Sequence, residues 1–167
     1  MQGEVRPATP DDAEAIVVIL NAIIAARVYT AFDTPFTVEA EREYIRHLHP
    51  RAVLHVAVSR ADRTIVGFQI MEPFATYTHA FDHVATLGTY VDLQCRRQGV
   101  ATELFQSTFV AALRNGFEKI FTFVRADNAG ALQTYLRQGF RVIGTAHRQA
   151  KIDGVFIDEI LIERFLK

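Results

Sequence analysis

The sequence contains a single cysteine, Cys95, so it can form no internal disulfide and offers no cysteine-based metal site. One unpaired thiol fits a reducing compartment. The formal charge is nearly balanced, with a net value of −1. No overall excess of positive charge indicates a polyanionic partner. We therefore expect neither a metal centre nor a nucleic-acid partner.

Long hydrophobic runs are also missing. The longest apolar stretch, residues 13–26, is interrupted by Glu14 and Asn21 and is too short to cross a bilayer. The first residues, MQGEVRPATPDD, contain no apolar signal-peptide core. Half of the 167 residues are nevertheless hydrophobic, which is enough for a substantial core. These observations predict a soluble, cytoplasmic protein without membrane contact, and one domain that spans residues 1–167.

Four stretches have the periodicity and end signals of helices. Thr9 is followed by proline and two aspartates, a strong helix start, and Thr37 precedes two glutamates in the same way. Pro50 ends the second helix, whereas Gly116 and Gly139 end the third and fourth. The predicted helices cover residues 10–24, 38–47, 99–115 and 129–137.

The remaining periodic stretches predict strands at residues 4–6, 52–59, 64–71, 83–92, 119–124, 141–146 and 155–164. The resulting order is β-α-α-β-β-β-α-β-α-β-β. Strands that follow helices in the second half imply a mixed sheet with helices on both faces. The predicted fold class is therefore α/β (α+β), with about seven strands and about four helices.

The stretch from Val91 to Leu104, VDLQCRRQGVATEL, predicts an anion site. A strand ends, a basic loop follows, and a helix begins directly after Gly99. Backbone N–H groups and the positive end of a helix dipole then converge, which suits a phosphate or pyrophosphate. The loop lacks the glycine and lysine patterns of nucleotide-binding loops. It does fit the pattern Arg/Gln-x-x-Gly-x-Gly/Ala, with Arg96, Gly99 and Ala101 at the defined positions.

A second motif follows the next predicted strand: Asn128-Ala129-x-Ala131-Leu132-x-x-Tyr135-Leu136-x-x-Gly139-Phe140. At this separation and on these elements, the two motifs resemble the Gcn5-related N-acetyltransferase (GNAT) superfamily. The similarity covers the whole chain in the order of elements, and individual residues from Val91 to Phe140. It implies a GNAT-like fold and an enzyme, an N-acetyltransferase, that uses acetyl-CoA as acetyl donor and needs no metal.

The resemblance also assigns roles along the predicted cofactor site. The backbone at Val91 and Leu93 would meet the pantetheine and acetyl ends, and Asn128 would contact the pantetheine arm. Arg96 and residues 99–102 would hold the pyrophosphate, and Tyr135 would lie near the sulfur. The predicted acetyl-CoA site comprises Val91, Asp92, Leu93, Arg96, Arg97, Gln98, Gly99, Val100, Ala101, Thr102, Asn128 and Tyr135.

Three residues depart from the usual family pattern. Leu93 stands where proline is common, Arg97 where glycine is common, and Ala101 replaces the second glycine of the loop motif. The first two bear on the shape of the loop, and alanine is an accepted variant at the third.

Aminolysis of a thioester needs a neutral amine, a stabilised oxyanion and a protonated leaving sulfur. Tyr135 is the candidate general acid, because the pKa of a phenol is near that of a thiol. The alternative is that it only packs beside Phe140. Gly88 lies inside a predicted strand, where glycine often marks a bulge. A bulge between Gly88 and Val91 would free an N–H group for the oxyanion.

The general base is left open between several groups. Glu72, Asp82 and His83 all lie at the ends of strands beside the central strand, and a water relay is an equal contender. Glu72 is the residue that we predict as catalytic, because it ends a strand and can point into the acceptor cleft. Cys95 follows the predicted strand at residues 83–92 and lies next to two arginines. Exposure there would lower its pKa, but we expect it to serve only as a small apolar side chain.

The predicted acceptor is the primary amine of a small molecule or an amino acid. Residues 21–36, with Lys151 and Asp158, are similar to the branch that acetylates phosphinothricin, methionine sulfoximine and related amino acids. Tyr135 differs from this branch, which often has histidine there. The alternatives are a protein or peptide N-acetyltransferase and a non-catalytic acetyl-CoA-binding module. A homodimer is one way to cover the last apolar strand.

Overall fold

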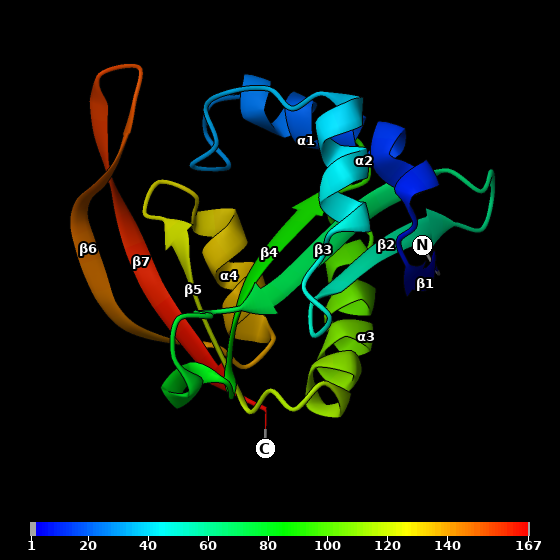
Figure 1. Cartoon of the computed structure of the whole chain (residues 1–167). Coiled ribbons are helices and arrows are strands. Elements are labelled where there is room, and N and C mark those ends of the chain that lie inside the picture. The colour runs from blue at the N-terminus through cyan, green and yellow to red at the C-terminus, as the bar shows by residue number, and fades with distance from the viewer. Residues whose placement is uncertain (1–2, 167) are drawn as a thin grey trace.

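The computed structural model describes residues 3–166 and contains seven strands in one sheet (Figure 1). The strand order is β1-β2-β3-β4-β5-β7-β6. Neighbouring strands are antiparallel except β4 and β5, which are parallel. The strands are β1 (Gly3–Pro7), β2 (Val53–Ser59), β3 (Ile65–Pro73), β4 (Val84–Val91), β5 (Lys119–Arg125), β6 (Arg141–Ile152) and β7 (Val155–Phe165).

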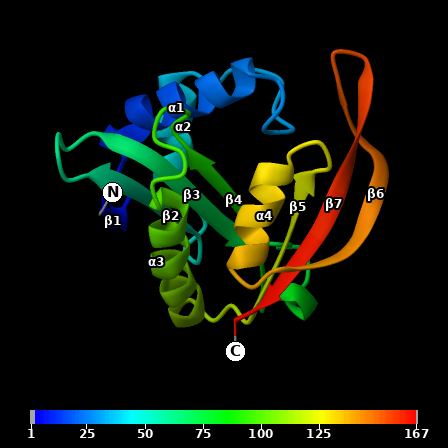
Figure 2. The same ribbon diagram turned by 180° about the vertical axis from the view of Figure 1, so that it is seen from behind.

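Helices cover both faces of the sheet, as the element order predicts. Helices α1 (Ala13–Ala25) and α2 (Val38–Arg46) lie on one face, and α3 (Val100–Arg114) and α4 (Ala129–Arg137) lie on the other (Figures 1 and 2). Two short 3-10 helices cover Pro10–Asp12 and His79–Phe81. No helix within residues 3–166 is long and apolar enough to cross a membrane.

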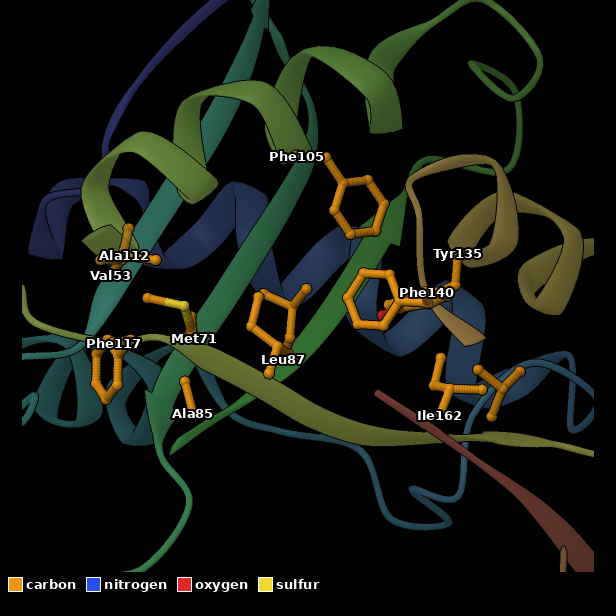
Figure 3. Packing of buried hydrophobic residues seen from close by; sticks show 12 residues of the cluster. Val53, Met71, Ala85, Leu87, Phe105, Ala112, Phe117, Tyr135, Phe140 and Ile162 are labelled. Carbon is orange, nitrogen blue, oxygen red and sulfur yellow. The ribbon is translucent and has the colours of Figure 1, made fainter. Parts of the chain in front are cut away.

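Each face of the sheet has its own apolar cluster. Under α1 and α2, the isoleucines of α1 pack on Val56 and Phe68 of the sheet. Under α3 and α4, Phe105, Tyr135 and Phe140 meet Leu87 and other sheet residues (Figure 3). Burial of a large apolar side chain stabilises the fold by roughly 1.5–3 kcal/mol. The two clusters therefore hold the sheet rigidly between the helix pairs.

The predicted caps form as hydrogen bonds. The Thr37 hydroxyl accepts from the Ala40 amide at 3.2 Å. Asp12 accepts from the Thr9 amide at 2.7 Å and completes a capping box with it. The Arg6 guanidinium also donates to Asp12, and this pair holds the pKa of the carboxyl below its usual value. These bonds fix where the 3-10 helix at Pro10–Asp12 and helix α2 begin.

One strand differs clearly from its predicted extent. The predicted strand ends at residue 146, but β6 continues to Ile152 as one half of a long hairpin with β7. The β6–β7 register shifts between Ala146 and Ala150, and Arg148 adopts a left-handed φ of 54°. This irregularity interrupts the period-two pattern, which explains why sequence alone shortens the strand.

Candidate active site

The two central strands, β4 and β5, separate after their first residues. They pair only at Val84 with Lys119 and at Ala85 with Ile120. The β4 carbonyls that face β5 are those of odd-numbered residues: His83 accepts from the Lys119 amide, and Leu87 accepts from the Thr122 hydroxyl at 2.8 Å. Because strand residues alternate, the backbone of Thr89 and Val91 faces the same side. Among residues 3–166, no strand pairs with the edge of β4 at Thr89 and Val91.

A cavity of about 440 Å³ lies in this gap. Side chains of β3, β4, β5, β7 and α4 line it, together with the segment that follows α1. The lining combines aromatic and aliphatic walls with two carboxylates. Its residues are Tyr29, Thr30, Ala31, Phe32, Ile70, Glu72, Thr86, Leu87, Gly88, Thr89, Tyr90, Thr122, Phe123, Val124, Arg125, Ala131, Tyr135 and Glu159.

The prediction of a bulge between Gly88 and Val91 is wrong, because no bulge forms there. The β3–β4 register runs without a shift from the Gly67–Val91 pair to the Pro73–Ala85 pair. Gly88 instead leaves room for an aromatic ring, because a Cβ built on it would lie 3.0 Å from Tyr90. The backbone groups that the bulge was predicted to free are instead left accessible by the separation of β4 from β5.

The loop between β4 and α3 has the conformation of an anion site. Gly99 adopts a left-handed φ of 89°, and a Cβ built on it would meet nothing within 4 Å. The first α3 hydrogen bond runs from the Glu103 amide to the Gly99 carbonyl. The amides of Val100, Ala101 and Thr102 therefore precede the hydrogen-bonded ladder and belong to the positive end of the helix. This arrangement leaves open space in front of Gly99 beside those amides.

The residues that depart from the family pattern leave the loop turn intact. Arg97 adopts φ of 59°, the left-handed conformation that glycine takes without strain. Asp92 accepts from the Gln94 amide at 2.8 Å through its side chain and from the Cys95 amide at 2.9 Å through its carbonyl. A side chain and a tight turn thus hold the loop at the positions where proline and glycine are usual.

Cys95 is half-buried against Val5 and Val91. Burial, with Asp92 nearby, raises the pKa of its thiol. The sequence predicts a lowered pKa only for an exposed thiol. Cys95 is not exposed, and its burial and the nearby carboxylates oppose ionisation.

Two predicted cofactor residues meet the segment that follows α1. The Arg96 guanidinium lies 3.8 Å from the centre of the Tyr29 ring. The Asn128 side chain donates to the Tyr29 carbonyl at 3.2 Å and accepts from the Ala131 amide at 3.1 Å, which caps α4. Asn128 therefore joins the start of α4 to the cavity edge, and Tyr29 lies between the two predicted halves of the cofactor site.

Tyr135 packs in the core through its ring and directs its hydroxyl toward β4. It is 7% exposed, and its ring packs edge-on against Phe105 and Phe140 at centroid distances of 5.2 and 5.1 Å. Its hydroxyl lies 3.1 Å from the Thr89 hydroxyl on β4. Burial raises the pKa of Tyr135 to about 12, which keeps the phenol protonated at neutral pH. The ring is part of the core, and the hydroxyl reaches the gap.

The three candidate bases are not brought together. Glu72 lines the cavity, half-buried, and forms a hydrogen bond with the Tyr44 side chain. Asp82 and His83 are exposed and immediately precede β4, at the end where it still pairs with β5. The Asp82 carboxylate lies 2.9 Å from the His79 ring instead. Of the three, only Glu72 lies where an acceptor could meet it.

Sequence analysis missed a buried carboxylate, Glu159 on β7. It is 1% exposed, is paired in register with Arg125, and has one carboxylate oxygen, Oε2, without a hydrogen-bond partner. Burial raises its pKa to about 6, and the Arg125 charge offsets part of that effect. The available signal was the pair of adjacent acidic residues, Asp158 and Glu159, inside the apolar run FIDEILI, of which the sequence analysis singles out only Asp158.

Known proteins share this architecture. Residues 24–140 match the acetyltransferase (GNAT) family. A Bacillus subtilis (strain 168) protein named "Putative phosphinothricin acetyltransferase YwnH" is 29% identical over 96% of this chain and 98% of its own length. A GCN5-related N-acetyltransferase from Kribbella flavida is 29% identical, with a TM-score of 0.85 over 98% of this chain and 97% of that one.

A third protein shows the same fold with a ligand. It is a GNAT-superfamily phosphinothricin acetyltransferase from Sinorhizobium meliloti in complex with acetyl-CoA, 16% identical, with a TM-score of 0.89. The alignment covers 99% of this chain and 89% of that one. The family match covers most of the chain and both predicted motifs up to Phe140, and so this chain belongs to the acetyltransferase (GNAT) family and is an N-acetyltransferase.

Proposed function

We propose that this enzyme transfers the acetyl group of acetyl-CoA directly to the primary amine of a small molecule or amino acid. The observation that carries the proposal is the continuity of two features. The unpaired edge of β4 at Thr89 and Val91 leads straight into the anion loop before α3. An extended pantetheine arm along β4 would therefore end with its pyrophosphate at the amides after Gly99.

The remaining cofactor contacts follow from this placement. Arg96 and the helix N-terminus supply positive charge for the pyrophosphate, while Asn128 lies across the gap at the start of α4. The open space at Gly99 admits a phosphate close to the backbone. Asp92, Leu93, Arg97 and Gln98 shape the loop that contains these groups.

The reaction proposed is aminolysis. The neutral amine attacks the thioester carbonyl carbon, and the π electrons of the carbonyl move to its oxygen. The nitrogen gives up one proton to a base or to water, and the tetrahedral intermediate collapses with loss of the thiolate of CoA. A backbone N–H group on the gap side of β4, at Thr89 or Val91, is placed to stabilise the oxyanion, an effect of roughly 3 kcal/mol. The Tyr135 hydroxyl, held by Thr89, donates the proton to the leaving sulfur.

Glu72 is the proposed base among the residues identified from sequence. It lies on the α1 and α2 side of the sheet, within the cavity and near the Tyr44 side chain. A carboxylate there can take the ammonium proton directly or through a water molecule. Its position separates the base from Tyr135, which packs on the opposite side of the sheet.

Thiol release in the presence of acetyl-CoA and a panel of primary amines tests the proposed reaction. Release with at least one amine is expected, with a matching acetylated product by mass spectrometry. Tight acetyl-CoA binding without release for any amine would support the non-catalytic module instead.

The Gly99→Val substitution is expected to weaken acetyl-CoA binding by at least roughly 10-fold, because the added side chain fills the space reserved for the pyrophosphate and strains a left-handed residue. Isothermal titration calorimetry measures the effect. Gly154→Val is the matched control: Gly154 has φ of 82° and equally open space, but lies in the β6–β7 turn. Equal affinities for the two variants would contradict the placement of the pyrophosphate.

A further inference from the structure

The cavity of about 440 Å³ between β4 and β5 has a carboxylate on either side of the gap between these strands. Glu72 is on β3, one strand outside β4, and Glu159 is on β7, one strand outside β5. Glu159 shares a sheet face with its register partner Arg125, which bonds to the segment after α1. Both carboxylates line the same cavity as that segment.

The positive charge in the cavity wall is already engaged. Among the lining residues, all of which lie within residues 3–166, Arg125 is the only one with a basic side chain. Its Nε and Nη2 groups donate to both oxygens of Asp127, at 2.8 and 2.6 Å. Its Nη1 group donates to the carbonyls of Arg27 and Thr30, at 2.9 and 3.0 Å. A carboxylate on the acceptor would therefore meet two glutamates and no unengaged cation.

Glu159 itself is short of partners. The side chain is almost fully buried, and its Oε2 atom has no hydrogen bond. A buried carboxylate loses most of its hydration energy, and an unsatisfied oxygen on a charged group is especially costly. A cationic nitrogen placed in the adjoining cavity would supply the missing hydrogen bonds and the compensating charge. Elsewhere in the same cavity, the apolar side chains of Phe32, Ile70 and Phe123 suit a carbon chain.

We propose that Glu159 binds a cationic nitrogen of the acceptor, and that the cavity thereby selects primary amines without a carboxylate over amino acids. The inference rests on the proposed function and narrows its acceptor class. A substrate carboxylate would be repelled by Glu72 and Glu159 in a partly desolvated space, where charge interactions are stronger than in water. An amine with an apolar body gains at both the glutamates and the aromatic walls.

Two acceptor pairs that differ only by a carboxylate test the proposal: cadaverine with lysine, and phenethylamine with phenylalanine. For wild type, kcat/KM should be at least roughly 10-fold higher for the amine of each pair, equivalent to about 1.4 kcal/mol. The Glu159→Gln variant should lose most of this preference, and Glu159→Asp should keep it. Glu14→Gln, an exposed change on α1, is the control and should behave as wild type.

The outcomes separate this inference from the proposed function. Turnover that favours lysine and phenylalanine, or a preference unchanged in Glu159→Gln, would overturn the role of Glu159 while leaving the acetyltransferase assignment intact. If no acceptor reacts, calorimetric titration of cadaverine into the CoA-bound protein still decides the inference. Binding to wild type that weakens by at least roughly 10-fold in Glu159→Gln supports it, and equal or undetectable binding refutes it.

Discussion

The Tyr135→Phe substitution is expected to lower kcat by about 100-fold, the lower end of what a positioned general acid contributes. Phenylalanine keeps the ring that packs on Phe105 and Phe140, so the fold should persist with a loss of about 1 kcal/mol. Thr89 still accepts from the Gln69 side-chain amide at 2.8 Å, so its hydroxyl does not lose all its partners. The affinity for acetyl-CoA should change by less than about threefold, because only one hydroxyl is removed.

The measurements are kcat for the best acceptor and acetyl-CoA affinity by calorimetry. Tyr77→Phe is the control, because Tyr77 is 82% exposed and lies in the loop after β3. A Tyr135→Phe enzyme with kcat within about threefold of wild type would show that the residue serves packing alone. Because burial raises the pKa of Tyr135 to about 12, its ionisation should not limit the rate of the wild type below about pH 11.

The sequence predicted those parts of the fold that depend on local chemistry. The caps at Thr9 and Thr37 and the left-handed residue Gly99 are short-range features, and the structure confirms all three as helix starts. Periodicity also predicted the positions of the strands. The helices between the later strands indicated a mixed sheet, which contains one parallel pair, β4 and β5. The element order and the mixed sheet followed from these local signals, because few topologies satisfy them together.

The site was harder to predict because it depends on contacts between distant strands. The gap beside β4 arises from where β5 turns away, and no residue in either strand encodes that angle by itself. The glycine at position 88 predicts a bulge, but its lack of a side chain instead makes room for Tyr90. Similarly, Asp82 and His83 are near β4 in sequence but lie at its paired end.

Glu159 shows the same limit most clearly. A glutamate in a strand is usually on a solvated face, and alternation alone places Asp158 and Glu159 on opposite faces without telling which is buried. Burial of Glu159 is decided by β5, whose Arg125 lies opposite it, and by the segment after α1 that Arg125 holds. Such a position becomes visible only once three segments of the chain are placed together.

The Glu159→Gln substitution is expected to stabilise the protein above about pH 6.5, by about 2 kcal/mol. Burial raises the pKa of Glu159 from 4.5 to about 6, and each unit of difference is worth about 1.4 kcal/mol. Between these values the unfolded chain has lost a proton that the folded protein retains. The free energy of unfolding therefore falls as pH rises through this window, and the loss is complete above it. Glutamine does not titrate and is spared this loss.

Urea unfolding of wild type and Glu159→Gln at about pH 4.5 and pH 7.5 measures the effect. The difference in unfolding free energy should be small at the lower pH and near its full value at the higher one, whereas Glu14→Gln should show no such trend. The groups that line the cavity with Glu159 are Arg125 from β5, Glu72 from β3, Tyr90 from β4, Tyr135 from α4 and Tyr29 from the segment after α1. Because both proteins share these groups, their own titration largely cancels in the difference. A difference of the same size at both pH values would mean that Glu159 is not the titrating group.

The burial of a charged carboxylate that lowers stability at neutral pH is best explained by a ligand whose positive charge compensates it. If Glu159 binds a cationic amine, saturating cadaverine should raise the unfolding temperature of wild type at pH 7.5 by several degrees, as mass action requires for a ligand that binds only the folded state. The same cadaverine should leave Glu159→Gln nearly unchanged, although that variant starts from the higher unfolding temperature. Stabilisation of both proteins by equal amounts would place the amine elsewhere, and the cost of burying Glu159 would then need another cause.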